Sequence, residues 1–192
     1  MRAHGALRRR WPRLGSSTSL GRPRRHPCCP PPAARRVHTE ARLAELGVVL
    51  PPPPVPRGNY VFCSRAGPHV HGIGIPARPD GSLVAGSVGD QLSAEEGAAA
   101  ARLAAINLLA TLKGELGDLD RARLVKVTGY VNCVDGFEDH PVVMNGFSDL
   151  MVDALGDERG VHCRAAVGTR ALPLGMCVEI EALIEVLDDG GT

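Results

Sequence analysis

Aromatic residues are scarce in this chain. Its 192 residues include one Trp, two Tyr and three Phe, which together make up 3% of the sequence. Proteins that bind single-stranded nucleic acid stack the bases on aromatic side chains in a basic groove. The scarcity argues against a dedicated nucleic-acid surface, and it predicts a core built from Ala, Val, Leu and Ile.

Long apolar runs and closely spaced cysteine pairs are also missing. No apolar run reaches the roughly 18 residues of a membrane-spanning helix, so no membrane association is predicted. None of the six cysteines belongs to a Cys-x-x-Cys pair, the common spacing of a zinc site. We expect reduced thiols in an intracellular compartment, and neither a metal nor a cofactor.

Acidic residues are absent from positions 1–38, which contain ten arginines and are rich in Pro and Ser. This composition is typical of a mitochondrial or plastid transit peptide, although its prolines would interrupt an amphipathic helix. The alternatives are a disordered basic tail and an over-extended gene model. Residues 1–38 are expected to be disordered in each case, and without targeting the protein would be cytoplasmic.

The rest of the chain is acidic. It contains 12 Lys and Arg residues and 21 Asp and Glu residues, so it carries about nine net negative charges. The net charge of the whole chain is +1. A domain that binds nucleic acid usually shows a basic stripe instead. No nucleic-acid partner is therefore predicted.

Residues 39–57 are predicted to lead into the main domain. A short helix is expected at 39–46, with Thr39 as its cap and Gly47 at its end. Prolines 51–54 and 56 then predict a polyproline II stretch along the domain. The domain itself is expected at 58–187, followed by a tail at 188–192.

The domain pattern predicts an α+β fold with a single mixed six-stranded sheet and two helices on one face. Ser93 and Glu96 form a capping box at the start of the first helix. The other face of the sheet is expected to be apolar and buried against identical subunits. In the order β-β-β-α-β-α-β-β, the elements are predicted at 59–64, 69–75, 82–88, 93–116, 123–132, 137 or 141 to 155, around Arg164, and 176–181.

Two motifs in the second predicted strand have competing interpretations. Gly72-Ile73-Gly74 resembles a dinucleotide fingerprint, but Pro76 and turn residues follow where a helix would have to begin, so we reject that reading. His69 and His71 share one face of the strand and could ligate a metal. No third ligand is nearby, which favours two ordinary strand histidines.

The segment 163–181 reads as two strands around a Leu-Pro-Leu-Gly turn. Arg164 could face Glu179 across this hairpin or in a neighbouring subunit. The Arg fork suits a carboxylate, and the glutamate could hold a water or pass a proton. The alternative is a surface ion pair worth about 0–1 kcal/mol. Cys163 would face away from Arg164, and we expect it to be a core thiol.

Several motifs in this chain resemble the RidA/YjgF family, also called endoribonuclease L-PSP or chorismate mutase-like. The proline run, Gly58-Asn59-Tyr60 and residues 145–150 resemble one branch of that family, and the likeness covers roughly residues 42–187. The matching residues of the C-terminal signature are Arg164, Ala165, Val167, Leu172, Pro173, Glu179 and Glu181.

The resemblance implies a homotrimer in which three sheets form a barrel, with clefts between subunits. It also implies an enamine/imine deaminase, which hydrolyses 2-aminoacrylate-type imines to 2-keto acids and ammonia. Two alternatives stay open: a non-catalytic protein that binds small carboxylates in the same clefts and, with less support, an endoribonuclease.

The resemblance further implies roles for individual residues. Arg164 would clamp the substrate carboxylate and Glu179 would position a water, both as catalytic residues. Tyr60, Asn145 and a backbone contact at Gly72 or Gly74 would complete the substrate site. The chain departs from the family pattern at Ala165, where a Ser is usual, and at Ala166, where many deaminases have a Cys. These departures put the choice of substrate in doubt.

Overall fold

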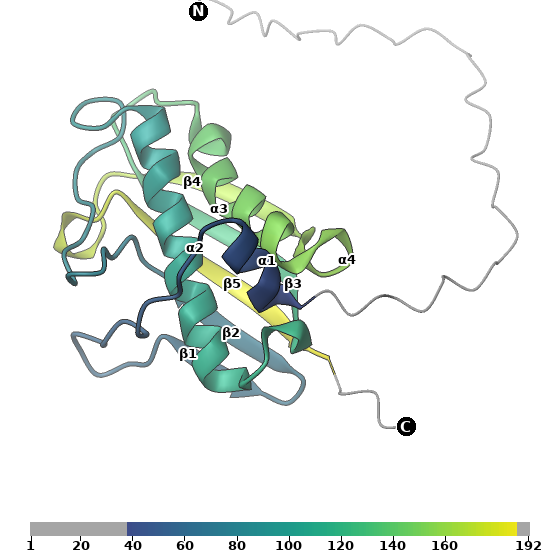
Figure 1. The fold of residues 1–192 in the computed structure, drawn as a ribbon. Helices are drawn as coiled ribbons and strands as arrows, with labels where there is room; N and C mark the ends of the chain where they lie inside the picture. The colour runs from purple at the N-terminus through teal and green to yellow at the C-terminus, as the bar shows by residue number, and fades with distance from the viewer. Residues whose placement is uncertain (1–37, 188–192) are drawn as a thin grey trace, which may run out of the picture. The chain divides into compact units, whose positions relative to one another are not determined.

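The computed structural model describes residues 38–187 (Figure 1). The expected transit peptide, apart from His38, and the expected tail at 188–192 lie outside the described residues. The helices of the domain pack on one face of a mixed sheet, which gives the two-layer α+β arrangement that the sequence predicts. No helix in the described part is long and apolar enough to cross a membrane.

Within residues 38–187 the sheet has five strands, not the six expected. Its order is β1-β2-β5-β3-β4, and every neighbouring pair is antiparallel except β3 with β4. The strands are β1 (Cys63–Ala66), β2 (His69–Gly74), β3 (Ala122–Asn132), β4 (Cys163–Thr169) and β5 (Val178–Val186).

The missing strand is the one predicted at 82–88. This segment forms isolated bridges, in which Leu83 pairs with Ala77 and Ala85 pairs with Met176. Gly86 has a φ of 132° and Gly89 a φ of 93°. Positive φ values break an extended strand, so the segment cannot continue a ladder.

The first long helix, α2 (Ala94–Leu116), confirms the predicted helix at 93–116. The Ser93 Oγ accepts a hydrogen bond from the Glu96 backbone N at 3.1 Å, and the Ser93 backbone N donates to the Glu96 carboxylate at 2.8 Å. Both partners lie within one turn, so the capping box is fixed locally. Gly117 ends the helix with a φ of 73°.

The second long helix, α3 (His140–Leu155), lies beside α2 over the sheet (Figure 1). The two helices approach closely at Gly146, where an added Cβ would lie 1.9 Å from the Ala98 carbonyl oxygen. Small residues of α2, such as Ala101 and Ala104, are fully buried. The core is therefore mainly aliphatic, as the scarcity of aromatic residues predicts.

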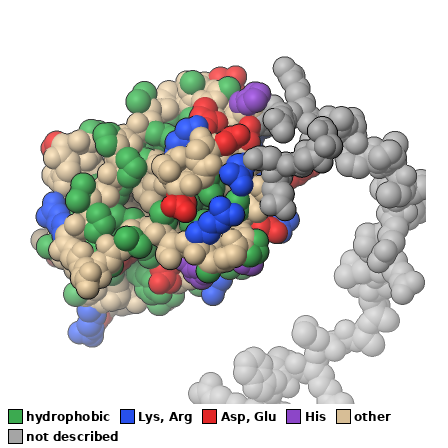
Figure 2. Space-filling view, turned by 90° about the horizontal axis from the view of Figure 1, so that it is seen from below, with side chains coloured by type: hydrophobic (Ala, Val, Ile, Leu, Met, Phe, Trp, Pro, Cys, Tyr) green, Lys and Arg blue, Asp and Glu red, His purple; other side chains and the backbone are tan. Residues whose placement is uncertain are grey.

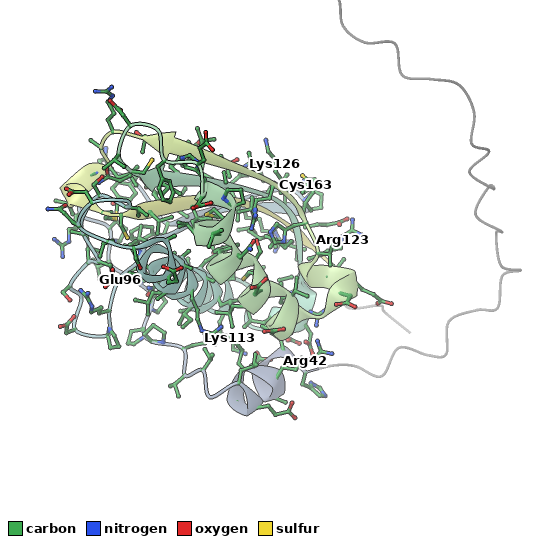
Figure 3. The ribbon with its side chains drawn as sticks, turned by 90° about the horizontal axis from the view of Figure 1, so that it is seen from above. Arg42, Glu96, Lys113, Arg123, Lys126 and Cys163 are labelled. Atoms are coloured by element: carbon green, nitrogen blue, oxygen red, sulfur yellow. The ribbon has the colours of Figure 1, made fainter. Side chains whose placement is uncertain are left out.

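The face of the sheet away from the helices carries charged residues beside apolar ones such as Val167 and Leu183, so it is mixed and not the apolar face expected. Arg123 and Glu185 form an ion pair at 2.5 Å there, and the Tyr130 hydroxyl donates to Glu181 at 3.1 Å. Cys163 is exposed, not a core thiol. It pairs in register with Lys126, and both lie on this open face (Figure 3).

Two short helices, α1 (Thr39–Glu45) and α4 (Asp157–Gly160), are joined through the carboxylate of Asp120. The Asp120 Oδ1 accepts hydrogen bonds from the Thr39 backbone N at 2.9 Å, from the Thr39 hydroxyl at 2.7 Å and from Arg159 at 3.2 Å. Burial opposes ionisation of Asp120, but these hydrogen bonds and the charge of Arg159 outweigh burial and lower its pKa.

Replacing Asp120 with Ala leaves these donors without their acceptor. We expect a loss of about 1–3 kcal/mol in the free energy of unfolding, measured in urea. Asp135→Ala is the matched control, because Asp135 also pairs with an Arg but is 78% exposed. That change should cost less than about 1 kcal/mol. Equal losses would contradict the structural role of Asp120.

The lowered pKa of Asp120 also sets a pH dependence. Its contribution to stability is present above the ordinary pKa of 3.8 and is lost as the pH falls through the lower folded-state value. The stability difference between the wild type and Asp120→Asn should therefore shrink below about pH 4. Urea unfolding between pH 7 and pH 3 measures it, and a constant difference would contradict the account.

Candidate functional site

The two strands that were predicted to form a hairpin at 163–181 are not neighbours in the structure. Strand β3 lies between β4 and β5, so the two strands do not pair with each other. Arg164 lies opposite Val127 of β3, which is fully buried under the helices. Glu179 lies opposite Tyr130 on the open face. The prediction of a hairpin is therefore wrong. Within one chain, Arg164 and Glu179 lie on opposite faces of the sheet.

Arg164 is held by the first turns of α3. Its Nη1 donates to the Asn145 Oδ1 at 3.1 Å and to the Ser148 Oγ at 2.9 Å, and its Nη2 donates to the Pro141 carbonyl at 3.3 Å. The structure thus brings together two residues of the predicted site, Arg164 and Asn145. The surface pair of Arg164 with Glu179, the alternative drawn from the sequence, does not form within the chain.

The guanidinium of Arg164 keeps two N–H groups for a ligand. An arginine has five N–H donors, and three of these are used in the bonds to α3. Within residues 38–187, the Nε–H and one hydrogen of Nη2 have no acceptor. Two donors of a planar fork are what a carboxylate needs for a bidentate interaction.

Ser148 and His162 complete this cluster, and neither was predicted as a site residue from the sequence. The Ser148 Oγ lies 3.0 Å from the His162 Nε2, and the His162 Nδ1 lies 2.6 Å from the Gly160 carbonyl oxygen. The signal was available, because His162 is two residues before Arg164 on an extended segment and Ser148 is three residues after Asn145 on a helix.

A thiol–imidazole pair borders the same side of β4. The Cys133 Sγ lies 3.4 Å from the His140 Nε2. A Cβ on Gly168 would lie 2.5 Å from that nitrogen and 3.0 Å from the sulfur, so the glycine leaves room for the pair. Burial is the main cause that raises the pKa of the Cys133 thiol, which therefore stays protonated near neutral pH.

A groove of about 890 Å³ lies on another part of the domain. Tyr60 and Glu179 both line it, together with the proline stretch 51–56, Ile73 and Leu83. Burial, and then the negative charge of Glu181, raise the pKa of Glu179. Arg164 and Asn145 do not line this groove, so the predicted site residues fall into two separate groups in one chain.

Gly72 and Gly74 face α2, not the groove. A Cβ on Gly72 would lie 2.6 Å from the Leu108 Cδ1, and a Cβ on Gly74 would lie 2.7 Å from the Ala104 carbonyl oxygen. Both glycines therefore allow the sheet and the helix to approach closely. Their contact with a substrate stays a prediction.

A family model described as "YjgF/chorismate mutase-like, putative endoribonuclease" matches residues 40–185. The chain belongs to this family. The resemblance to RidA/YjgF proteins is thereby confirmed, and the five-stranded α+β sheet with its covering helices matches the YjgF fold.

Individual relatives agree with this assignment. Protein TCP17 of Trypanosoma cruzi is 41% identical over 149 residues, which cover 76% of this chain and 92% of that protein. A solved structure of unknown function from Agrobacterium tumefaciens, Atu1372, is 38% identical with a TM-score of 0.71, over 78% of this chain and 94% of its own.

A third relative is described as a "putative endoribonuclease". This structure from Shewanella oneidensis is 30% identical with a TM-score of 0.74, and the match covers 78% of this chain and 100% of the Shewanella chain. The two solved structures share the fold, and the descriptions of the three relatives name either no function or a "putative endoribonuclease".

The pKa of Glu179 gives a direct test of the groove's electrostatics. Glu181→Gln removes the neighbouring negative charge, so the pKa of Glu179 should fall but stay above its ordinary 4.5 because of burial. Carbon-13 NMR titration of the Glu carboxyl groups measures this value. Glu185→Gln on the same strand is the control and should leave it unchanged; no response to Glu181→Gln would contradict the account.

Proposed function

We propose that this protein is an enamine/imine deaminase, which hydrolyses 2-aminoacrylate-type imines to 2-keto acids and ammonia. Membership of the RidA/YjgF family supports the proposal. The observation that carries it is the state of Arg164: three acceptors on α3 hold the guanidinium, and two of its donors remain open for a carboxylate.

We also propose that the deaminase is a homotrimer whose sites lie between subunits. Arg164 lies on the helix side of an edge strand, whereas Glu179 and Tyr60 line the groove. One chain therefore keeps the clamp and the carboxylate apart. A neighbouring copy that brings its Arg164 to the groove would complete the site.

The chemistry needs a carboxylate clamp, a positioned water and a proton carrier. Glu179 takes a proton from the water as its oxygen bonds to the imine carbon, and the C=N double bond becomes a single bond. The nitrogen takes up two protons, one returned by Glu179 and one lost by the new hydroxyl group, and leaves as ammonia as the C–N bond breaks and the C=O bond forms. The raised pKa of Glu179 suits this exchange, because both of its protonation states become accessible closer to neutral pH.

The size of the groove bears on the substrate. The groove has a volume of about 890 Å³ and is lined largely by prolines and aliphatic side chains such as Ile75 and Leu83. Pockets of this size bury drug-sized ligands. The 2-aminoacrylate imine would leave most of it empty. We propose that imines with larger apolar side chains are also substrates.

The alternative is a non-catalytic carboxylate-binding protein, which would use Arg164 but would not need Glu179 as a proton carrier. An endoribonuclease has less support. On the face that Figure 2 shows, Lys and Arg are interspersed with Asp and Glu, and no basic stripe is visible there.

A coupled assay tests the deaminase proposal. A serine or threonine dehydratase generates the imine, and keto-acid release is followed with residues 39–192 of this protein. Arg164→Ala should lower kcat/KM at least about 100-fold, because the substrate loses its bidentate clamp. Glu179→Gln should lower kcat about 10²–10⁴-fold with little change in carboxylate affinity.

Arg170→Ala is the control, because Arg170 pairs with Asp135 at the surface and is 84% exposed. It should behave as the wild type. No acceleration by a wild-type protein that is confirmed to be trimeric would refute the deaminase and favour the binding protein.

A further inference from the structure

A directed chain of hydrogen bonds leads from the backbone to Arg164. The Gly160 carbonyl oxygen can only accept, so the proton of the neutral His162 ring lies on Nδ1. The His162 Nε2 is then an acceptor, and the Ser148 hydroxyl donates to it. The lone pairs of the Ser148 oxygen are left for the Nη1 of Arg164. Each bond thus fixes the direction of the next one.

Protonation of His162 would reverse the hydrogen bond between its Nε2 and the Ser148 hydroxyl. The Nε2 would become a donor to the Ser148 oxygen, whose own hydrogen would need another acceptor. A positive ring would also lie one hydroxyl away from the guanidinium. The neutral ring is the form that supports Arg164 in its position.

We propose that His162, through Ser148, is a positioning residue for Arg164, and that carboxylate binding at Arg164 weakens when the His162 ring takes up a proton. The proposal rests on the proposed function, in which Arg164 binds the substrate carboxylate. It adds a pH-dependent control of substrate affinity that depends on two residues outside the C-terminal signature.

The surroundings of His162 agree with a neutral ring. The ring packs edge-to-face with the ring of Phe147, with centroids 6.4 Å apart. From α3 it faces Ser148 and from α4 the Gly160 carbonyl, and neither group titrates in this range. Burial lowers the pKa of His162 below 6.5; the hydrogen bond to the Gly160 carbonyl opposes this shift, and the positive charge of Arg164 adds to it.

Isothermal titration with pyruvate tests the proposal. Every protein in this series carries Glu179→Gln, which removes the titration of that carboxyl, and the protein with no further change serves as the wild type. The measurements run from pH 8 to pH 5. The dissociation constant should rise about tenfold as the pH falls through the pKa of His162, because a charged hydrogen bond loses its geometry.

Two pairs of variants separate positioning from general damage to the structure. His162→Gln keeps an acceptor for Ser148 and cannot take up a proton, so it should bind pyruvate as the wild type does at pH 8 with a flat pH profile. Ser148→Ala should weaken binding on the order of tenfold at pH 8, and Ser148→Thr should restore it. His71→Gln, on the open face of the sheet, is the control and should keep the pH dependence.

The outcomes distinguish this proposal from the one on which it rests. Intact pyruvate binding with the same pH profile in His162→Gln as in the wild type overturns the positioning role alone. No pyruvate binding to the wild type at any pH overturns the carboxylate clamp, and the positioning role with it.

Discussion

The position of β3 between β4 and β5 is the constraint on which the site depends. Strand β3 is followed by α3 and the parallel strand β4, a crossover that covers one face of the sheet. The chain then passes the end of β3 and returns as β5 on its other side. Because side chains alternate between the faces of a strand, this route places Arg164 under α3 and Glu179 on the open face. A deaminase site built from both residues therefore requires two copies of the chain.

Locally encoded parts of the fold could be predicted from the sequence. The helix at 94–116 is fixed by the Ser93–Glu96 capping box and by Gly117, all within a turn of its ends. The pairing of strands is not local. Residues 163–181 look like a hairpin because two strands flank a short turn, and nothing within the segment reveals that β3 separates them. The predicted strand at 82–88 is absent because Gly86 within it and Gly89 just after it adopt positive φ values, which a propensity argument does not locate.

In the candidate site, too, the sequence revealed the residues but not all of their contacts. The motifs brought out Arg164 and Asn145, which lie in contact, and Glu179 and Tyr60, which share a groove. The two residues that hold Arg164 were missed, since Ser148 lies on α3 and His162 on the extended segment before β4, and their contact is set by tertiary packing. The hydrogen bonds through Ser148 and His162 fix the orientation of the Arg164 side chain. Cys163 was wrongly taken as a core thiol, because the strand has an exposed second face.

The proposed site joins Arg164 of one subunit to Glu179 of another, and subunit mixing tests this arrangement. Arg164→Ala and Glu179→Gln proteins carrying different tags are co-expressed, and the mixed trimers are isolated. Each mixed trimer then holds one site with both native residues, so deaminase activity should return to about one third of the wild-type value. Mixed trimers as inactive as the separate variants would contradict the shared site.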